Sequence, residues 1–185
     1  MMHYEGVNFM HKDVKEILYT SEQITEKCKE LAQRINEDYE GKELLLIGLL
    51  KGSVPFLAEL SKYITLDVLF DYMDVSSYDG AQSRNIVIKK DVDQDVRGKD
   101  ILLVEDILDT GKTLNTVQHM FLEKGAKSVE IVTLLDKKEG RLLPIEAKYA
   151  GYEIPNAFVI GYGLDFNERY RNLPYVGILK EECYK

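Results

Sequence analysis

The chain has 185 residues, 45% of them hydrophobic, which suits one globular domain that buries its core without disulfides. Its 32 acids and 24 bases give a formal charge of -8, which disfavours a protein whose main partner is nucleic acid. The two cysteines, Cys28 and Cys183, fit reduced thiols, and no stretch resembles a signal peptide or a membrane span. We therefore expect a cytoplasmic protein with no membrane partner.

Helices and strands are expected to alternate along the chain. Apolar residues recur at helical spacing in 20–39, where Thr20 and Gln23 form a candidate capping box. Further helices are expected at 54–63 and 113–124, and strands at 43–50, 66–72, 85–89, 100–106, 128–135, 157–161 and 175–179. This pattern predicts an α/β fold with a mostly parallel twisted sheet flanked by helices, where ligands bind beyond the carboxyl ends of the strands.

The segment VEDILDTGKT (104–113) lies at one such strand end. GKT looks like the end of a P-loop, but Asp106 stands where that motif needs glycine, and D-x-x-D is not the D-x-D spacing of aspartate-based phosphatases. Glu105 and Asp106 can accept hydrogen bonds from ribose hydroxyls or hold Mg²⁺. The following turn offers amides and hydroxyls at a helix N-terminus for one phosphate, from Asp109, Thr110, Gly111, Lys112 and Thr113. Unless the acids are only solvated charges at a helix start, the segment predicts a ribose 5-phosphate site.

This segment resembles the motif that binds phosphoribosyl pyrophosphate (PRPP) in type I phosphoribosyltransferases. Other segments resemble the hypoxanthine-guanine branch of that family, in order and spacing: LLKGSVPF, SSYDG, LLDKKEGR and FVIGYGLDFNERYRNLPYVGIL. The resemblance covers about residues 44–179 and implies a single domain, 1–185, with a core of about 40–160 and a small hood from about 1–20 and 161–185. It also implies purine salvage, in which Mg²⁺-dependent transfer of the 5-phosphoribosyl group from PRPP to N9 of hypoxanthine or guanine gives IMP or GMP and pyrophosphate.

The resemblance implies roles at the pyrophosphate end of the site. Lys51 and Gly52 bind pyrophosphate, after a Leu50–Lys51 peptide that can be cis, and Arg171 pairs with pyrophosphate oxygens. Ser77 and Tyr78 belong to a flap that closes over the reaction and excludes water. Metal ligands are Glu105 and Asp106, with Asp165 for a second Mg²⁺ on pyrophosphate. Two residues depart from the family pattern: Ser53 replaces a second glycine, and Asp79 makes the flap more acidic.

Around the purine base, the resemblance gives Lys137 the task of reading the 6-oxo group, which favours hypoxanthine and guanine over adenine. Lys138 competes for this role. The remaining purine-binding residues are Ile107 and Phe158, which contact the base, Val159, whose backbone reads its edge, and Asp165. Asp109 is the catalytic candidate, which hydrogen-bonds or transiently accepts the proton that leaves the ring, since a free aspartate of pKa about 3.9 is a weak base.

Other functions fit the same motif. A regulator could bind PRPP without catalysis, but such proteins usually add a basic nucleic-acid face or a further domain, and this chain has neither signal. A transferase for xanthine or a pyrimidine would differ only in its contacts to the base. By resemblance we expect a homodimer or homotetramer, and the short segment before the first helix is typical of bacterial members.

Overall fold

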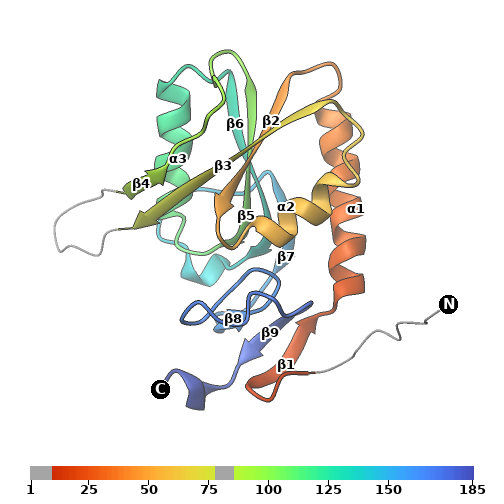
Figure 1. The fold of residues 1–185 in the computed structure, drawn as a ribbon, viewed down its shortest axis with the longest axis vertical. Coiled ribbons are helices and arrows are strands. Elements are labelled where there is room, and N and C mark those ends of the chain that lie inside the picture. Colours follow the sequence, from red (N-terminus) through yellow and green to blue (C-terminus); the bar gives the residue numbers. More distant parts are fainter. Residues whose placement is uncertain (1–9, 78–85) are drawn as a thin grey trace.

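The computed structural model describes residues 10–77 and 86–185. Its larger sheet has the strand order β4-β3-β2-β5-β6-β7, and every neighbouring pair is parallel except β3 and β4 (Figure 1). These strands are β2 (Leu44–Leu50), β3 (Val68–Ser77), β4 (Ile86–Lys90), β5 (Asp100–Leu108), β6 (Ser128–Asp136) and β7 (Tyr149–Glu153). The expected mostly parallel α/β sheet is confirmed.

Helices cover both faces of this sheet, as the unbroken apolar runs of β2 and β5 predict. The residues of α1 (Ser21–Asp38) and α2 (Val54–Ser61) pack on one face, and those of α3 (Lys112–Glu123) pack on the other. The expected capping box at the start of α1 is present: the Gln23 amide donates to Thr20 Oγ1 at 3.3 Å, and the Thr20 amide donates to Gln23 Oε1 at 2.9 Å.

Several element boundaries differ from those expected. β5 runs to Leu108 rather than 106, because Ile107 and Leu108 continue the pairing with β6. β3 runs to Ser77 rather than 72, because its polar end pairs antiparallel with β4, and its start is at Val68 rather than 66. β7 and the first strand, β1 (Val14–Tyr19), were not expected, since neither has a long apolar run.

A second, smaller sheet joins the two ends of the chain. It has the order β1-β9-β8 and contains β8 (Val159–Ile160) and β9 (Val176–Leu179), which pairs antiparallel with both neighbours. Val159 and Val176 belong to the same apolar cluster as Leu44 and Leu46 of β2, so the small sheet packs onto the main core. The carboxyl ends of the parallel strands point toward this small sheet (Figure 1).

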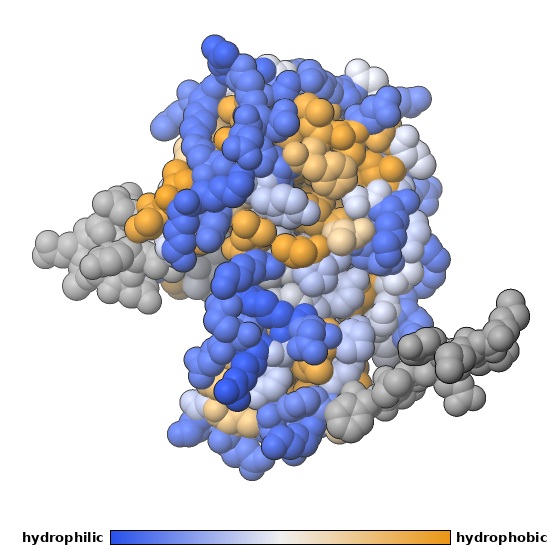
Figure 2. Space-filling model, viewed as in Figure 1, coloured by the Kyte–Doolittle hydropathy of each residue, from blue (hydrophilic) through white to orange (hydrophobic). Residues whose placement is uncertain are grey.

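Hydrophobic and hydrophilic residues are distributed unevenly over the surface of the two sheets. Figure 2 shows hydrophobic residues gathered over the upper part of the view, where β2 and β3 run, and mainly hydrophilic residues over the lower part, which holds the small sheet. Phe70 of β3 is 44% exposed. In the described ranges, 10–77 and 86–185, no helix has the length and apolar character needed to cross a membrane.

Candidate active site

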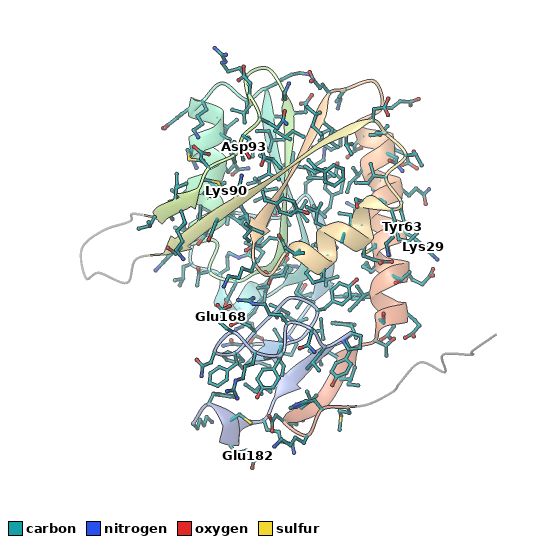
Figure 3. The ribbon with its side chains drawn as sticks, in the orientation of Figure 1. Lys29, Tyr63, Lys90, Asp93, Glu168 and Glu182 are labelled. Carbon is teal, nitrogen blue, oxygen red and sulfur yellow. The ribbon has the colours of Figure 1, made fainter. Side chains whose placement is uncertain are left out.

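The loops after β2, β5 and β6 emerge at the same edge of the sheet, where the chain after β8 also passes. Figure 3 shows Glu168, from this last segment, lying between the ends of the large sheet and the small sheet. The sequence predicted polar functional residues on each of these four segments. The fold therefore brings the predicted site residues of distant parts of the chain to one region.

The turn after β5 forms the start of α3 and leaves backbone amides free. Gly111 is the residue before the helix and has a φ of +80°, a left-handed conformation that glycine adopts without strain. Among the described residues, the amides of Asp109, Thr110 and Gly111 donate to no backbone acceptor. A cavity of about 110 Å³ lies in front of the turn, lined by Glu105, Ile107, Leu108, Asp109, Thr110, Gly111, Thr113 and Leu114. This cavity brings a carboxylate and unpaired amides together, as a ribose phosphate requires.

The two acids before the turn lie inside β5 rather than after its end. Asp106 is 8% exposed, and its carboxylate accepts the Ile107 amide at 2.7 Å. Burial raises the pKa of Asp106 to about 6, although that hydrogen bond and the positive charge of Arg171 lower it. Burial and the negative charge of Asp106 raise the pKa of Glu105 well above its ordinary value. Two neighbouring carboxylates are thus held where a cation would stabilise their charged form.

The residues present fit a divalent cation that takes its other ligands from the substrate. Glu105 Oε2 is buried and has no hydrogen-bond partner among the described residues. In that part of the chain, no group of three or more His, Cys, Asp or Glu side chains could hold a metal by itself. Mg²⁺ is commonly bound through one or two carboxylates together with substrate phosphates. Glu105 and Asp106 offer this kind of incomplete site.

The turn after β2 packs directly against Asp106. The Leu50–Lys51 peptide is cis, as the resemblance implies. At Gly52, a Cβ atom would lie 1.7 Å from Asp106 Oδ2, so only glycine permits this approach. Gly163, with a φ of +101°, comes equally close, because its Cβ would lie 1.9 Å from the Gly52 carbonyl oxygen. The Lys51–Gly52 turn is therefore held between the buried acids and the segment that follows β8.

Ion pairs connect this turn to the segment after β8. Arg171 lies 2.8 Å from Asp165 and 3.3 Å from Glu168, and Lys51 lies 2.8 Å from the second oxygen of Glu168. Asp165 also accepts the Glu168 amide at 2.9 Å, and Arg171 donates to the Gly163 carbonyl at 2.7 Å. The three residues expected at the pyrophosphate end, Lys51, Gly52 and Arg171, thus lie in one cluster with Asp165.

The turn after β6 distinguishes the two candidate lysines. Lys137 is 15% exposed, and its Nζ lies 3.5 Å from Asp109 Oδ2. Lys138 is 62% exposed and pairs with Glu153 at 2.7 Å. Gly140 lets the chain approach the same carboxylate, since its Cβ would lie 2.0 Å from Asp109 Oδ1. Lys137 therefore faces the candidate catalytic carboxylate, and Lys138 points elsewhere.

The apolar residues expected around the base occupy the start of β8 and the end of β5. Phe158 is 37% exposed, stacks on Tyr184 with ring centroids 5.2 Å apart, and meets the edge of Phe166 at 5.5 Å. It precedes β8, which is shorter than the expected strand, while Val159 is buried and pairs with β9. Ile107 is half-buried and lines the cavity at the turn.

The candidate flap is only partly within the described residues. Ser77 is the last residue of β3 and pairs with Ile86 of β4. Tyr78 and Asp79 lie outside the described residues.

Sequence reasoning missed two polar residues in this region. Glu168 bridges Lys51 and Arg171, and Arg141 donates to carbonyl groups of the turn after β5. Both belong to segments that had been singled out, LLDKKEGR and LDFNERYR. The charge of each residue within such a segment was the available signal, but the sequence does not tell which way a side chain points.

Known proteins resemble this chain over nearly its whole length. The family model described as the phosphoribosyl transferase domain matches residues 15–167. A hypoxanthine-guanine phosphoribosyltransferase of Streptococcus pneumoniae is 53% identical over 177 residues, which cover 95% of this chain and 98% of that protein.

Solved structures agree with this result. A hypoxanthine phosphoribosyltransferase from Staphylococcus aureus has a TM-score of 0.93 and 48% identity, with 97% of this chain and 99% of that chain covered. The Trypanosoma cruzi hypoxanthine phosphoribosyltransferase in complex with the product IMP has a TM-score of 0.91 and 39% identity, with 95% of this chain and 100% of that chain covered.

Proposed function

This chain belongs to the phosphoribosyl transferase family, as a hypoxanthine-guanine phosphoribosyltransferase of purine salvage, and from this premise we propose how its residues carry out the reaction. The 5-phosphoribosyl group of PRPP moves to N9 of hypoxanthine or guanine, which gives IMP or GMP and releases pyrophosphate. One observation carries the proposal: Glu105 and the unpaired amides of the turn after β5 line the same cavity. Carboxylates suit the sugar hydroxyls, and amides suit the 5′-phosphate.

The phosphate is held by the turn itself. Its oxygens accept hydrogen bonds from the amides at Asp109 to Thr113 and from the hydroxyls of Thr110 and Thr113, with Lys112 adding positive charge. The first amides of α3 have no partner inside the helix and add to the positive end of its dipole. Because the backbone provides most of these donors, few side chains need to be ordered when the phosphate binds.

The family uses a divalent metal, and Mg²⁺ suits the oxygen-rich residues of this site. Glu105 and Asp106 would hold one such ion on the sugar side, and Asp165 would hold a second ion on pyrophosphate. When bound, the cation offsets the charge of the carboxylates and of the leaving pyrophosphate. The orphaned Glu105 oxygen and the raised pKa of Asp106, about 6, support this assignment.

The leaving pyrophosphate is bound by Lys51, the turn at Gly52 and Arg171. Arg171 presents a planar fork suited to two phosphate oxygens, and Lys51 adds a point charge. Their contacts with Glu168, at 2.8 and 3.3 Å, support the proposal because they already keep both cations near one anionic group. Ser77 and Tyr78 belong to the flap that closes over the site and excludes water.

The base is read by Lys137 and packed by apolar residues. Lys137 donates to the 6-oxo group, Phe158 stacks on the ring, Ile107 packs against it, and the Val159 backbone reads its edge. Asp109 hydrogen-bonds the proton that leaves N7 and accepts it transiently. The 3.5 Å separation between Lys137 and Asp109 supports a shared site, because both side chains then reach one ring. No covalent nucleophile is needed, so positioning and electrostatics carry the catalysis.

Two wider assignments accompany this mechanism. Residues 1–185 form one domain with a hood made by the chain ends, which is supported by the apolar cluster shared between the small sheet and β2. The chain assembles as a homodimer or homotetramer, supported by the exposed side chains of Phe70, Val87 and Ile88.

Turnover assays test the proposal. Hypoxanthine, guanine, xanthine, adenine and uracil are each incubated with PRPP and Mg²⁺, and the nucleotide products are identified by chromatography. We expect IMP and GMP, and little or no product from adenine or uracil. Preferential use of xanthine would overturn the assignment at the base. PRPP binding without turnover on any base would support a regulator instead.

A further inference from the structure

One guanidinium group lies behind the phosphate turn rather than in front of it. Arg141 is absent from the lining of the 110 Å³ cavity that faces the turn. It lines a different cavity, of about 400 Å³, whose other lining residues belong mostly to the segment that follows β6. Its side chain is 14% exposed. Arg141 is thus a largely buried cation next to an anion site that it does not line.

The contacts of Arg141 are almost all to backbone carbonyl groups. Its Nε donates to the Asp109 carbonyl at 2.8 Å, and its Nη2 donates to the Leu108 carbonyl at 3.2 Å and to the Asp136 carboxylate. Its Nη1 donates to the Ile145 carbonyl. These bonds occupy all but one of its N–H groups. Little donor capacity is left for a phosphate, so the residue does not act as a direct phosphate ligand.

Other bonds from the same segment hold the turn in the same direction. The Leu142 amide donates to the Thr110 carbonyl at 3.1 Å, and the Lys137 amide donates to the Leu108 carbonyl at 3.0 Å. Together with Arg141, they engage three consecutive carbonyl groups, those of Leu108, Asp109 and Thr110. These hydrogen bonds fix the orientation of the peptide groups to which the three carbonyls belong. The amides of Asp109, Thr110 and Gly111 donate to no backbone acceptor among the described residues.

Close packing ties the turn to Arg141 as well. At Gly111, a Cβ atom would lie 2.4 Å from Ile145 Cγ2 and 3.2 Å from Arg141 Cδ. The left-handed backbone of Gly111 therefore rests on the side chain of Arg141 and on a residue whose carbonyl Arg141 binds. Movement of the guanidinium would release both the carbonyl groups and this contact.

We propose that Arg141 is a positioning residue for the 5′-phosphate: it fixes the backbone of the turn after β5 so that the amides meet the phosphate. The inference rests on the proposed function, because it assumes that the turn binds the phosphate of PRPP and IMP. A second consequence is that Arg141 joins this turn to Asp136, the last residue of β6, directly before Lys137. Lys137 keeps a support that does not involve Arg141, because its own amide donates to the Leu108 carbonyl at 3.0 Å.

The test compares ligands that carry the phosphate with one that does not. In Arg141→Met, we expect the KM for PRPP and the inhibition constant of IMP each to rise roughly 10- to 100-fold, because hydrogen bonds to a charged group become misaligned. The KM for hypoxanthine at saturating PRPP and the kcat should change by less than about threefold, since catalysis after binding uses other groups. Calorimetry with IMP gives the same affinity without turnover.

Arg141→Lys separates geometry from charge and serves as the second variant if Arg141→Met does not fold. A lysine keeps the charge, but one compact ammonium cannot bridge these separated carbonyl groups, so most of the loss should persist. Lys138→Met is the matched control, because Lys138 is exposed on the same segment and, within residues 10–77 and 86–185, its side chain pairs only with Glu153. It should behave as the wild type.

Three results would overturn the proposal. The first is wild-type affinity for PRPP and IMP in Arg141→Lys, and the second is unchanged affinity for both ligands in Arg141→Met. The third is a rise in the KM for hypoxanthine and a fall in kcat as large as the loss of PRPP affinity. The last of these would indicate a general structural role. Failure of the proposed function is distinct, since the wild-type protein would then show neither turnover nor IMP binding.

Discussion

The two ends of the candidate site are built differently. The phosphate turn after β5 is supported by largely buried groups, since the side chains of Arg141 and Asp136 are 14% and 9% exposed. The pyrophosphate end is joined by an ion pair between Lys51 and Glu168, which are 62% and 65% exposed. Buried hydrogen bonds to backbone fix geometry, whereas exposed ion pairs contribute little and exchange readily with water. The first end is suited to holding a group throughout a reaction, and the second to releasing one.

The largest expected effect is at Asp109, whose backbone belongs to the phosphate turn and whose side chain faces Lys137. Asp109→Asn keeps the shape but removes a carboxylate that can take up a proton, so kcat should fall by roughly 10²- to 10³-fold. The KM for PRPP should change by only a few-fold, because the backbone amides still hold the phosphate. Steady-state kinetics with PRPP and hypoxanthine measure both. Equal losses in kcat and PRPP affinity would argue against a role at the base.

Gly52 tests how closely the pyrophosphate turn must approach the buried acids. A Cβ in Gly52→Ala would lie 1.7 Å from Asp106 Oδ2, so either the turn or the carboxylate must move. We expect kcat/KM for PRPP to fall by about 10- to 100-fold, since small displacements of positioned groups are costly.

Gly41→Ala is the control for this variant. Gly41 has a positive φ, +72°, and its Cβ would meet no atom within 4 Å. It should lose some stability through backbone strain but keep the kcat/KM of the folded protein. A Gly52→Ala enzyme with wild-type kinetics would show that the acids need not be fixed against the turn.

Lys137, whose side chain is 15% exposed and lies beside Asp109 of the phosphate turn, offers a test at the more buried end of the site. Lys137→Ala should raise the KM for hypoxanthine by about 10-fold, because a hydrogen bond from a charged donor is lost, and should narrow the preference for 6-oxopurines over adenine. Lys138→Ala should do neither. Competition assays with the two bases measure this preference. If only Lys138→Ala changes it, the assignment moves to that residue.

The difference between the two ends also explains what the sequence could predict. The strand cores, the capping box at Thr20 and the turn at residues 109–113 follow from local patterns, and the structure has them. β7 and the support by Arg141 depend on contacts between segments far apart in the chain or on side-chain direction, which no local pattern encodes. The extra length of β5 also depends on a contact with another segment. Ile107 and Leu108 resemble loop residues in the sequence, but their pairing with β6 makes them part of the strand.

A smaller effect, on stability alone, extends the comparison to a site away from the reaction. Asp71 is 7% exposed and accepts the amides of Tyr72, Asp93 and Gln94 at 2.7, 2.6 and 2.9 Å. Burial acts to raise the pKa of Asp71, but these hydrogen bonds and the nearby Lys90 outweigh it and lower the pKa below its ordinary value. Asp71→Asn should therefore reduce the free energy of unfolding by about 1–3 kcal/mol at neutral pH.

The sign of its pH dependence follows from that lowered pKa. The stabilisation is present above the pKa of the unfolded state, about 3.9, and is lost as the pH falls through the lower pKa of the folded state. The difference between wild type and Asp71→Asn, measured by denaturant unfolding, should shrink in that acid range. A difference that grows with acidification would contradict the assignment.

The smallest effect is expected at Glu168, whose ion pairs are the weaker of the two kinds of contact compared above. Glu168→Gln removes the exposed ion pairs with Lys51 and Arg171. Because such pairs lie in water and are screened by salt, the midpoint of thermal unfolding should not change measurably, and the KM for PRPP should change by less than about threefold. Calorimetric unfolding and PRPP titration at low and high salt measure both quantities. A large loss of stability would show that the pyrophosphate end is as firmly built as the phosphate turn, and the contrast between them would then be wrong.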